Sequence, residues 1–186
     1  LIALEAAGYQ SEPQSLRSRL LTGWTMEQAK RMGASCAKLH FLYNPDAGAD
    51  AEYQEGFVAQ LVTEARAVDL PLLVEPISYP LDSALPKSSP AFAARRPDLV
   101  IESARRIGAL GPDVLKMEFP LDARFDDDES AWADACAALD AASPVPWVLL
   151  SAGVDFETFK RQVRAACQVG ARGEISPQLP LSSRAR

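Results

Sequence analysis

The sequence contains few of the residues from which metal centres and disulfide frameworks are built. It has 3 cysteines and 1 histidine among 186 residues. The cysteines, Cys36, Cys136 and Cys167, lie far apart and form no CxxC pair, so their pattern supports neither structural zinc nor a disulfide framework. We expect them to be buried or half-buried thiols in a reducing cytoplasm.

Long hydrophobic runs and an excess of positive charge are also missing. No apolar stretch approaches about 18 residues and no signal peptide is visible, so we expect a cytoplasmic protein with no membrane partner. The net charge is −6, which provides no global basic field for nucleic acid. Neither GxGxxG nor GxxxxGK[ST] occurs, and this removes the main support for dinucleotide or P-loop nucleotide binding.

Short apolar runs alternate with longer amphipathic segments along the chain. Because the apolar runs do not alternate with polar residues, we predict a parallel α/β sheet that is covered on both faces. A doubly wound sheet and a TIM barrel both fit this pattern. The connection 80–97 contains four prolines and little periodicity, and we interpret it as a long loop at a strand end. The predicted strands are 1–5, 36–43, 70–79, 113–119, 146–152 and, more weakly, 170–175, and the predicted helices are near 25–33, 52–68, 97–108, 129–141 and 155–169.

Polar residues occur near the C-terminal parts of four predicted strands. Lys38, Glu75 and Lys116 lie within apolar runs, and Ser151 ends another. In a barrel these strand ends converge on one mouth, so two lysines and a carboxylate would meet there. A structural ion pair that fills one layer of the barrel is an equally good interpretation of Lys38 and Glu75.

The stretch "GPDVLKMEFP" places Lys116 in an apolar run, where an ammonium group is costly unless it is paired or neutral. Its stem could simply extend to solvent. Alternatively, a desolvated neutral amine can attack a ketone and form a Schiff base, with Lys38 as the nearby cation and Glu75 as the acid/base group. Glu118 is expected on the same side of the strand, where it would orient Lys116 or pair with it.

Two further features are candidate substrate contacts. In "LLSAGVDFETF", Ser151 and Gly153 precede a predicted helix whose amides could face an anion, although Asp155 at the N-cap would compete for them. His40 lies on the same side of its strand as Lys38. A satisfied polar contact within the protein is the alternative for His40, because one histidine makes neither a triad nor a metal site.

Five stretches in order carry a resemblance to a known family. They are "LIALEAAGYQ", "GWTMEQAKRMGASCAKLHFLYNPD", "LPLLVEPISYP", "DVLKMEFP" and "PWVLLSAGVDFETF". Together they resemble the class I aldolases of the tagatose-1,6-bisphosphate aldolase group, which shares a superfamily with deoxyribose-phosphate aldolase and also resembles the sulfofructose-phosphate aldolases. The resemblance runs from residue 1 to about residue 173.

The resemblance implies a TIM barrel with no metal and no cofactor. It also implies reversible cleavage of a ketohexose bisphosphate to dihydroxyacetone phosphate and a three-carbon aldehyde. The Schiff-base lysine falls on Lys116, the acid/base glutamate on Glu75 and a second lysine of the site on Lys38. The phosphate-binding loop corresponds to Ser151, Ala152 and Gly153.

The chain departs from the family at both ends. The family begins with two further strands, and residues 176–186 do not match its pattern. We therefore expect an incomplete TIM barrel of about six strands over residues 1–175, then an atypical disordered tail over 176–186. Such a piece would be poorly stable and weakly active, and a homo-oligomer remains open for the full-length protein. The alternatives are a sulfofructose-phosphate aldolase, a non-catalytic sugar-phosphate-binding barrel and an inactive fragment.

Overall fold

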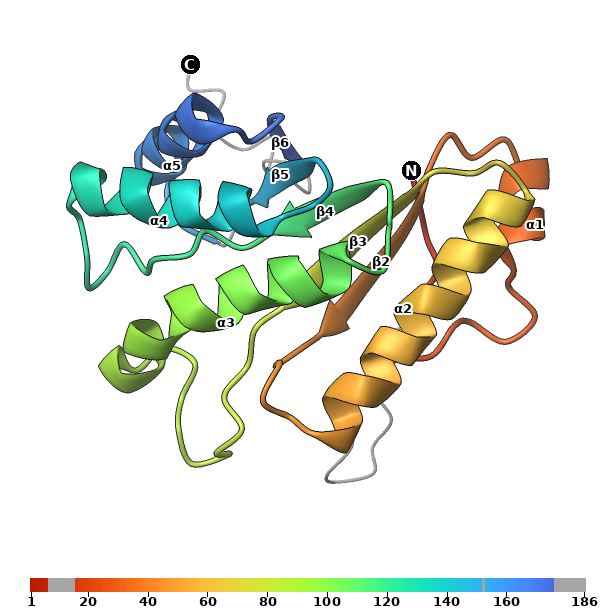
Figure 1. The fold of residues 1–186 in the computed structure, drawn as a ribbon, viewed down its shortest axis with the longest axis horizontal. Helices are drawn as coiled ribbons and strands as arrows, with labels where there is room; N and C mark the ends of the chain where they lie inside the picture. Colours follow the sequence, from red (N-terminus) through yellow and green to blue (C-terminus); the bar gives the residue numbers. More distant parts are fainter. Residues whose placement is uncertain (7–15, 152, 176–186) are drawn as a thin grey trace, which may run out of the picture.

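The computed structural model describes residues 1–6, 16–151 and 153–175, and these form one parallel sheet with helices between its strands (Figure 1). The strands follow the chain order from β1 to β6 without a crossover, and each pairs in parallel with the next. The strands are β1 (Ile2–Ala3), β2 (Ala37–Leu42), β3 (Leu72–Ile77), β4 (Val114–Met117), β5 (Trp147–Leu150) and β6 (Glu174–Ile175). The helices are α1 (Met26–Arg31), α2 (Ala49–Ala67), α3 (Pro90–Gly108), α4 (Glu129–Ala142) and α5 (Phe156–Val169).

The helices pack side by side in chain order, α1 on α2, α2 on α3, α3 on α4 and α4 on α5. This order of strands and helices is that of a barrel wall, in which every helix covers the outer face. A doubly wound sheet would instead divide its helices between two faces. The parallel α/β prediction is confirmed, and the barrel arrangement is favoured over the doubly wound one.

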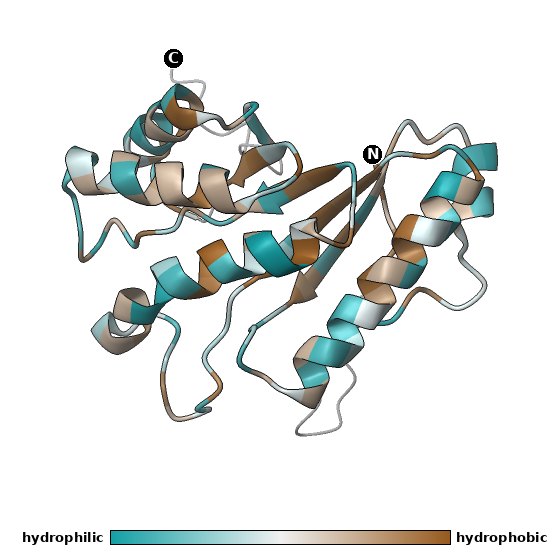
Figure 2. Cartoon of the chain, viewed as in Figure 1, coloured by the Kyte–Doolittle hydropathy of each residue, from teal (hydrophilic) through white to brown (hydrophobic). Residues whose placement is uncertain are grey.

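Alternate residues of each strand point toward this helical layer. Leu39 and Phe41 of β2 and Val74 of β3 are fully buried and belong to the hydrophobic core, together with Val58 and Leu61 of α2. Figure 2 shows the corresponding hydrophobic colouring of the central strands. Because successive side chains of a strand point to opposite faces, Lys38, His40 and Glu75 must face the other way, toward the barrel interior.

The capping signal of the first predicted helix is present as expected. The Gln28 amide donates to Thr25 Oγ1 at 3.2 Å, and the Thr25 amide donates to Gln28 Oε1 at 3.0 Å. This reciprocal pair satisfies two amides that the first turn of α1 would otherwise leave without partners.

The prediction for residues 80–97 is partly wrong, because α3 begins at Pro90 rather than near residue 97. Ser89 is its N-cap and accepts from the Phe92 amide, and Pro90 occupies the first turn, where a missing N–H costs nothing. Pro97 lies inside the helix, which continues through it. Pro90 and Pro97 are therefore helix-start and helix-interior residues, whereas Pro80 and Pro86 lie in the connection after β3, which is correspondingly shorter than predicted.

Candidate active site

The strand register brings the predicted site residues into neighbouring positions on one face of the sheet. His40 of β2 is paired with Glu75 of β3, and Lys38 is paired with Leu73 one layer below. The pairing of Val74 with Leu115 places Glu75 beside Lys116 when the register is continued by one residue. The predicted convergence of Lys38, Glu75 and Lys116 is therefore present in the structure.

The carboxylate of Glu75 lies between the two lysine ammonium groups. Lys116 Nζ is 3.3 Å from Glu75 Oε1, and Lys38 Nζ is 3.3 Å from Glu75 Oε2. The side chains of Lys116 and Glu75 are each 5% exposed and that of Lys38 is 21% exposed. Lys116 does not extend to solvent, so the sequence alternative of an exposed ammonium is wrong.

A second carboxylate, Glu5, completes the group that we call the Glu75 cluster (Glu5, Lys38, Glu75 and Lys116). Glu5 Oε1 is 3.4 Å from Lys38 Nζ. The other oxygen, Oε2, is buried and has no hydrogen-bond partner among the described residues. Sequence reasoning missed Glu5, although it ends the first predicted strand "LIALE" in the same way as the other polar residues end theirs.

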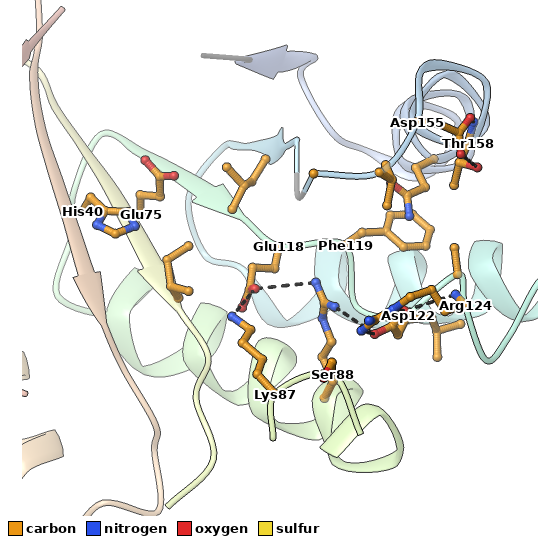
Figure 3. Close-up of a pocket in the computed structure, with 18 residues that line it drawn as sticks. His40, Glu75, Lys87, Ser88, Glu118, Phe119, Asp122, Arg124, Asp155 and Thr158 are labelled. Carbon is orange, nitrogen blue, oxygen red and sulfur yellow. Dashed lines mark hydrogen bonds and ion pairs between the residues drawn. The ribbon is translucent and has the colours of Figure 1, made fainter. Parts of the chain in front are cut away.

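A cavity of about 780 Å³ opens beside this cluster, and His40 and Glu75 form part of its wall (Figure 3). The His40 imidazole makes no hydrogen bond within the described part of the chain. The satisfied polar contact that was the alternative for His40 is therefore absent there, and its role as a substrate contact stays a prediction.

The predicted phosphate-binding loop lies at another part of the same cavity. Gly153 has φ +72° and lines the cavity, and Ser151 is half-buried just before it. A side chain is strained at this φ, which explains why glycine stands there. Ala152 lies outside the described residues.

The expected competition from Asp155 is present at the start of α5. Its carboxylate accepts from the Thr158 amide at 3.0 Å and from Thr158 Oγ1 at 2.6 Å. These hydrogen bonds hold the pKa of Asp155 below its usual range. An anion at this helix start would therefore find the Thr158 amide already in use.

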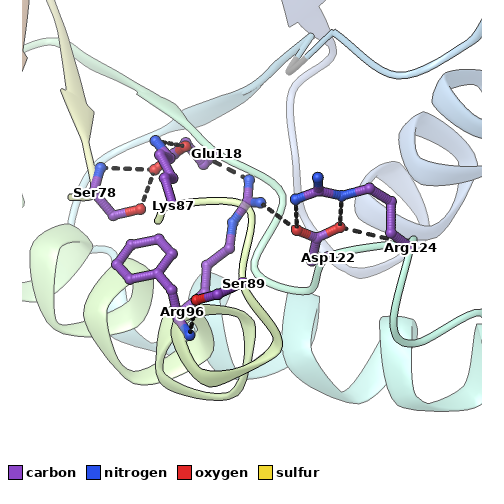
Figure 4. Close-up of polar contacts among 8 residues, drawn as sticks. Ser78, Lys87, Ser89, Arg96, Glu118, Asp122 and Arg124 are labelled. Carbon is purple, nitrogen blue, oxygen red and sulfur yellow. Dashed lines mark hydrogen bonds and ion pairs between the residues drawn. The ribbon is translucent and has the colours of Figure 1, made fainter. Parts of the chain in front are cut away.

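The expectation that Glu118 pairs with Lys116 or orients it directly is wrong. Glu118 accepts from the Ser78 amide at 2.7 Å and from Ser78 Oγ at 2.5 Å (Figure 4). It also contacts Lys87 Nζ at 2.9 Å and Arg96 Nη2 at 3.5 Å. Glu118 follows the end of β4, so its side chain is directed to partners on the β3–α3 connection and on α3.

This network continues to the connection after β4. Arg96 Nη1 is 3.8 Å from Asp122 Oδ2, and Asp122 accepts from Arg124 Nε at 2.9 Å and from Arg124 Nη2 at 2.6 Å. Arg124 is also the main cause that lowers the pKa of Asp122. We call Ser78, Lys87, Arg96, Glu118, Asp122 and Arg124 the Glu118 cluster.

The pKa of Glu118 reflects a balance of large opposing effects. Burial by itself would raise this pKa, since it disfavours the charged carboxylate. Arg96, Lys87 and the hydrogen bond from Ser78 outweigh burial, so the pKa of Glu118 lies below its usual value. The sequence did not reveal this cluster, because the partners of Glu118 lie far away in the chain and nothing in "AARRP" identifies Arg96 as a buried residue.

Neither a metal site nor a membrane span is found in the described residues. No group of three or more His, Cys, Asp or Glu side chains there is arranged to hold a metal ion. In the same residues, no helix has the length and apolar character needed to cross a bilayer.

Comparison with known proteins decides the family. A model of the DeoC/LacD family aldolases matches residues 1–177. The chain belongs to this family. It is 29% identical over 184 residues to tagatose 1,6-diphosphate aldolase 2 of Streptococcus pyogenes serotype M3, covering 92% of this chain and 56% of the relative. It is 28% identical over 185 residues to the tagatose 1,6-diphosphate aldolase of Staphylococcus aureus strain JH9, with the same coverage of 92% and 56%.

A solved structure shares the fold of this DeoC/LacD family chain. It is an archaeal fructose-1,6-bisphosphate aldolase whose catalytic lysine is covalently bound to the carbinolamine intermediate of its substrate. The TM-score is 0.64 at 21% identity, and the match covers 94% of this chain and 61% of the archaeal one. The strands and helices described above are therefore part of a TIM barrel, and the chain spans 56% of the length of the curated relatives it matches.

Proposed function

We propose that this chain carries the catalytic residues of a Schiff-base aldolase that acts on a phosphorylated ketose. The observation that carries the proposal is the contact of Lys116 with Glu75, in which a lysine of 5% side-chain exposure lies 3.3 Å from a carboxylate that lines a cavity. A cavity onto which a few polar side chains converge is the usual form of a small-molecule site. The family supports the same reaction class.

In the proposed reaction, the neutral amine of Lys116 attacks carbon 2 of the ketose and forms a carbinolamine. Loss of water gives an iminium ion, which is an electron sink. Glu75 then removes the proton of the carbon-4 hydroxyl, and the bond between carbons 3 and 4 breaks. Its electron pair moves toward the iminium nitrogen, which leaves an enamine on Lys116 and releases a three-carbon aldehyde.

The remaining steps return the enzyme to its starting state. A proton is added to carbon 3 of the enamine, and hydrolysis of the resulting iminium releases dihydroxyacetone phosphate and the free amine. We assign to Lys38 the orientation of Glu75, because its ammonium donates to Glu75 Oε2 at 3.3 Å. The same ammonium is 3.4 Å from Glu5 Oε1, so Glu5 provides it with a second counter-charge.

Tagatose 1,6-bisphosphate is the substrate that we propose. Both curated relatives described above carry the name tagatose 1,6-diphosphate aldolase. The position of Gly153 in the cavity wall, after a half-buried Ser151, supports a phosphate contact there. We assign His40 to a contact with substrate hydroxyl groups, because its ring faces the cavity beside Glu75.

The proposal is tested by release of dihydroxyacetone phosphate from tagatose 1,6-bisphosphate, coupled to NADH oxidation. Lys116→Met should reduce release to background, since methionine fills a similar volume but has no amine. Lys160→Met is a matched control, because Lys160 is a half-exposed lysine that is ion-paired with Glu157 outside the cavity. Full cleavage activity in a folded Lys116→Met variant would disprove the proposed mechanism.

A further inference from the structure

The Glu118 cluster contains a lysine that the proposed reaction does not use. Lys87 lies on the connection between β3 and α3 and lines the same cavity as Glu75. Its side chain is 42% exposed, whereas its partner Glu118 is only 4% exposed. Lys87 therefore rests on a buried carboxylate while its ammonium remains accessible from the cavity.

The Lys87 ammonium has N–H donors that no partner among the described residues uses. Glu118 Oε1, at 2.9 Å, is the one partner of its ammonium among the described residues. An ammonium has three N–H donors, so two remain available. Arg124, in contrast, makes two hydrogen bonds to Asp122, and Arg96 is buried between Glu118 and Asp122. Arg96 Nε also has no hydrogen-bond partner among the described residues, but it is buried, so of Lys87 and Arg96 it is Lys87 whose unused donors are accessible from the cavity.

The Glu118 cluster also contains more positively charged than negatively charged side chains. Three cations, Lys87, Arg96 and Arg124, share two carboxylates, Glu118 and Asp122. Two other carboxylates line the cavity: Glu75, which is paired with Lys38 and Lys116, and Asp155, which is engaged at the N-terminus of α5, where the helix dipole favours its charge. An anion next to Lys87 would thus complete the charge balance.

The position of Lys87 relative to Lys116 indicates which end of the substrate would carry the anionic group. Lys87 follows β3 and Gly153 follows β5, and these strands flank β4, which carries Lys116. In Figure 3, Lys87 and Asp155 lie on opposite sides of Glu118. A ketose that is attacked by Lys116 and has one phosphate at the Ser151–Gly153 loop would therefore extend its other end toward Lys87.

We propose that Lys87 binds the anionic group at the end of the substrate remote from the carbonyl that Lys116 attacks, and that it determines specificity for substrates that carry such a group. The inference rests on the proposed aldolase function and adds a substrate contact to it. Phosphate and sulfonate share the chemistry required, since each presents oxygens that accept from an ammonium. Anchoring by Glu118 holds the ammonium in place before the anion arrives, which lowers the cost of ordering it.

The experiment measures borohydride trapping of Schiff bases by the chain, followed by mass spectrometry, as a function of ligand concentration. The probes are dihydroxyacetone phosphate and tagatose 1-phosphate, which have no remote anion, and tagatose 1,6-bisphosphate, which has one. A ketose 1-phosphate with a sulfonate on carbon 6 distinguishes the two anions. The variants are Lys87→Met, Lys87→Arg, which keeps the charge, and Lys160→Met as the matched control.

Lys87→Met should raise the half-saturating concentration of tagatose 1,6-bisphosphate by about tenfold, the scale of one charge-assisted hydrogen bond. Trapping of the two probes without a remote anion should be unchanged, and so should all trapping by Lys160→Met. Lys87→Arg should recover most of the loss. The better of the phosphate and sulfonate probes identifies the natural anion, and the effect of Lys87→Met should be larger on that probe.

Two different failures are distinguishable. If the unaltered chain, shown to be folded, forms no adduct with dihydroxyacetone phosphate, the proposed function fails and this inference fails with it. If the adduct forms but Lys87→Met weakens all the probes equally or none of them, the aldolase proposal stands and the specificity role of Lys87 is overturned. A Lys87→Arg variant as weak as Lys87→Met would also overturn it, because charge would then not be the cause.

Discussion

Two buried glutamates at neighbouring strand ends bind cations in different ways. Glu75 contacts two lysines at 3.3 Å each, and only the contact with Lys38 has the geometry of a hydrogen bond. Glu118 instead accepts three hydrogen bonds, at 2.5 to 2.9 Å, from the amide and hydroxyl of Ser78 and from Lys87, and it also faces Arg96. The Glu75 carboxylate therefore accepts fewer and longer hydrogen bonds than the Glu118 carboxylate does.

The difference follows from what each type of cation can do. A lysine ammonium can lose its proton when it is desolvated and then act as a nucleophile, whereas an arginine guanidinium stays charged. A carboxylate that must exchange protons during a reaction cannot be committed to many strong donors. We therefore infer that the Glu75 cluster performs chemistry, and that the Glu118 cluster stabilises the ends of β3 and β4 around it.

The largest expected effect concerns the base. Glu75→Gln should slow the cleavage of tagatose 1,6-bisphosphate by about a hundredfold or more, the usual contribution of general acid–base catalysis. The Schiff base with dihydroxyacetone phosphate should still form, because Lys116 is intact. Release of dihydroxyacetone phosphate measures the first effect, and borohydride trapping measures the second. Cleavage at the rate of the unaltered chain would remove Glu75 from the mechanism.

The same kind of change at Glu118 should affect stability instead. Glu118→Leu removes the closest anionic partner of Arg96, and leaving a buried charge poorly paired costs about 3 kcal/mol in the free energy of unfolding. Urea denaturation monitored by circular dichroism measures this cost. Replacing Arg96 by methionine in the same chain should restore most of the loss, since an apolar pair no longer needs a counter-charge. If the double variant is less stable than Glu118→Leu alone, the account of this pair is wrong.

The location of these two clusters shows what the sequence could predict. The four central strands were found because their apolar runs are continuous, and Lys38, Glu75 and Lys116 were found because a charged residue in such a run is conspicuous. The partners of Glu118 were not found, because its contacts with Ser78, Lys87 and Arg96 cross from β4 to another part of the chain. Only the folded register decides which charges meet.

Helix α3 shows a second limit of sequence reasoning. Prolines in 80–97 indicated a loop, yet Pro90 stands in the first turn of α3 and Pro97 lies inside it. Because a proline is compatible with both a loop and a helix start, tertiary contacts decide between them. Arg96 makes such contacts here, with Glu118 and Asp122, and Phe92 and Leu99 of the same helix are buried.

The contribution of Glu118 to the free energy of unfolding should depend on pH. Because the folded-state pKa of Glu118 is lowered, its ionised form contributes stability above the unfolded-state pKa of about 4.3. This contribution is lost as the pH falls below that value and through the folded-state pKa. The unaltered chain should therefore lose more unfolding free energy than Glu118→Gln between pH 7 and pH 3.5. Equal losses in urea titrations at the two pH values would exclude Glu118 as an acid-sensitive group.

The smallest expected effect concerns one hydrogen bond. Ser78→Ala removes the hydroxyl donor to Glu118 but leaves the backbone amide in place. We expect a loss of about 1.5 kcal/mol in unfolding free energy, which is typical of a hydrogen bond to a charged group. Trapping of dihydroxyacetone phosphate on Lys116 should be unchanged. A Ser78→Ala variant that keeps its stability but loses trapping would contradict the division between the two clusters.

The most direct test of the central claim is the site of borohydride trapping with dihydroxyacetone phosphate, mapped by peptide mass spectrometry on the unaltered chain. The account predicts one reduced adduct, on the peptide that contains Lys116, and none in Lys116→Met. An adduct on Lys38 or Lys87, or no adduct in a chain shown to be folded, would contradict the assignment of the Glu75 cluster as the reactive one.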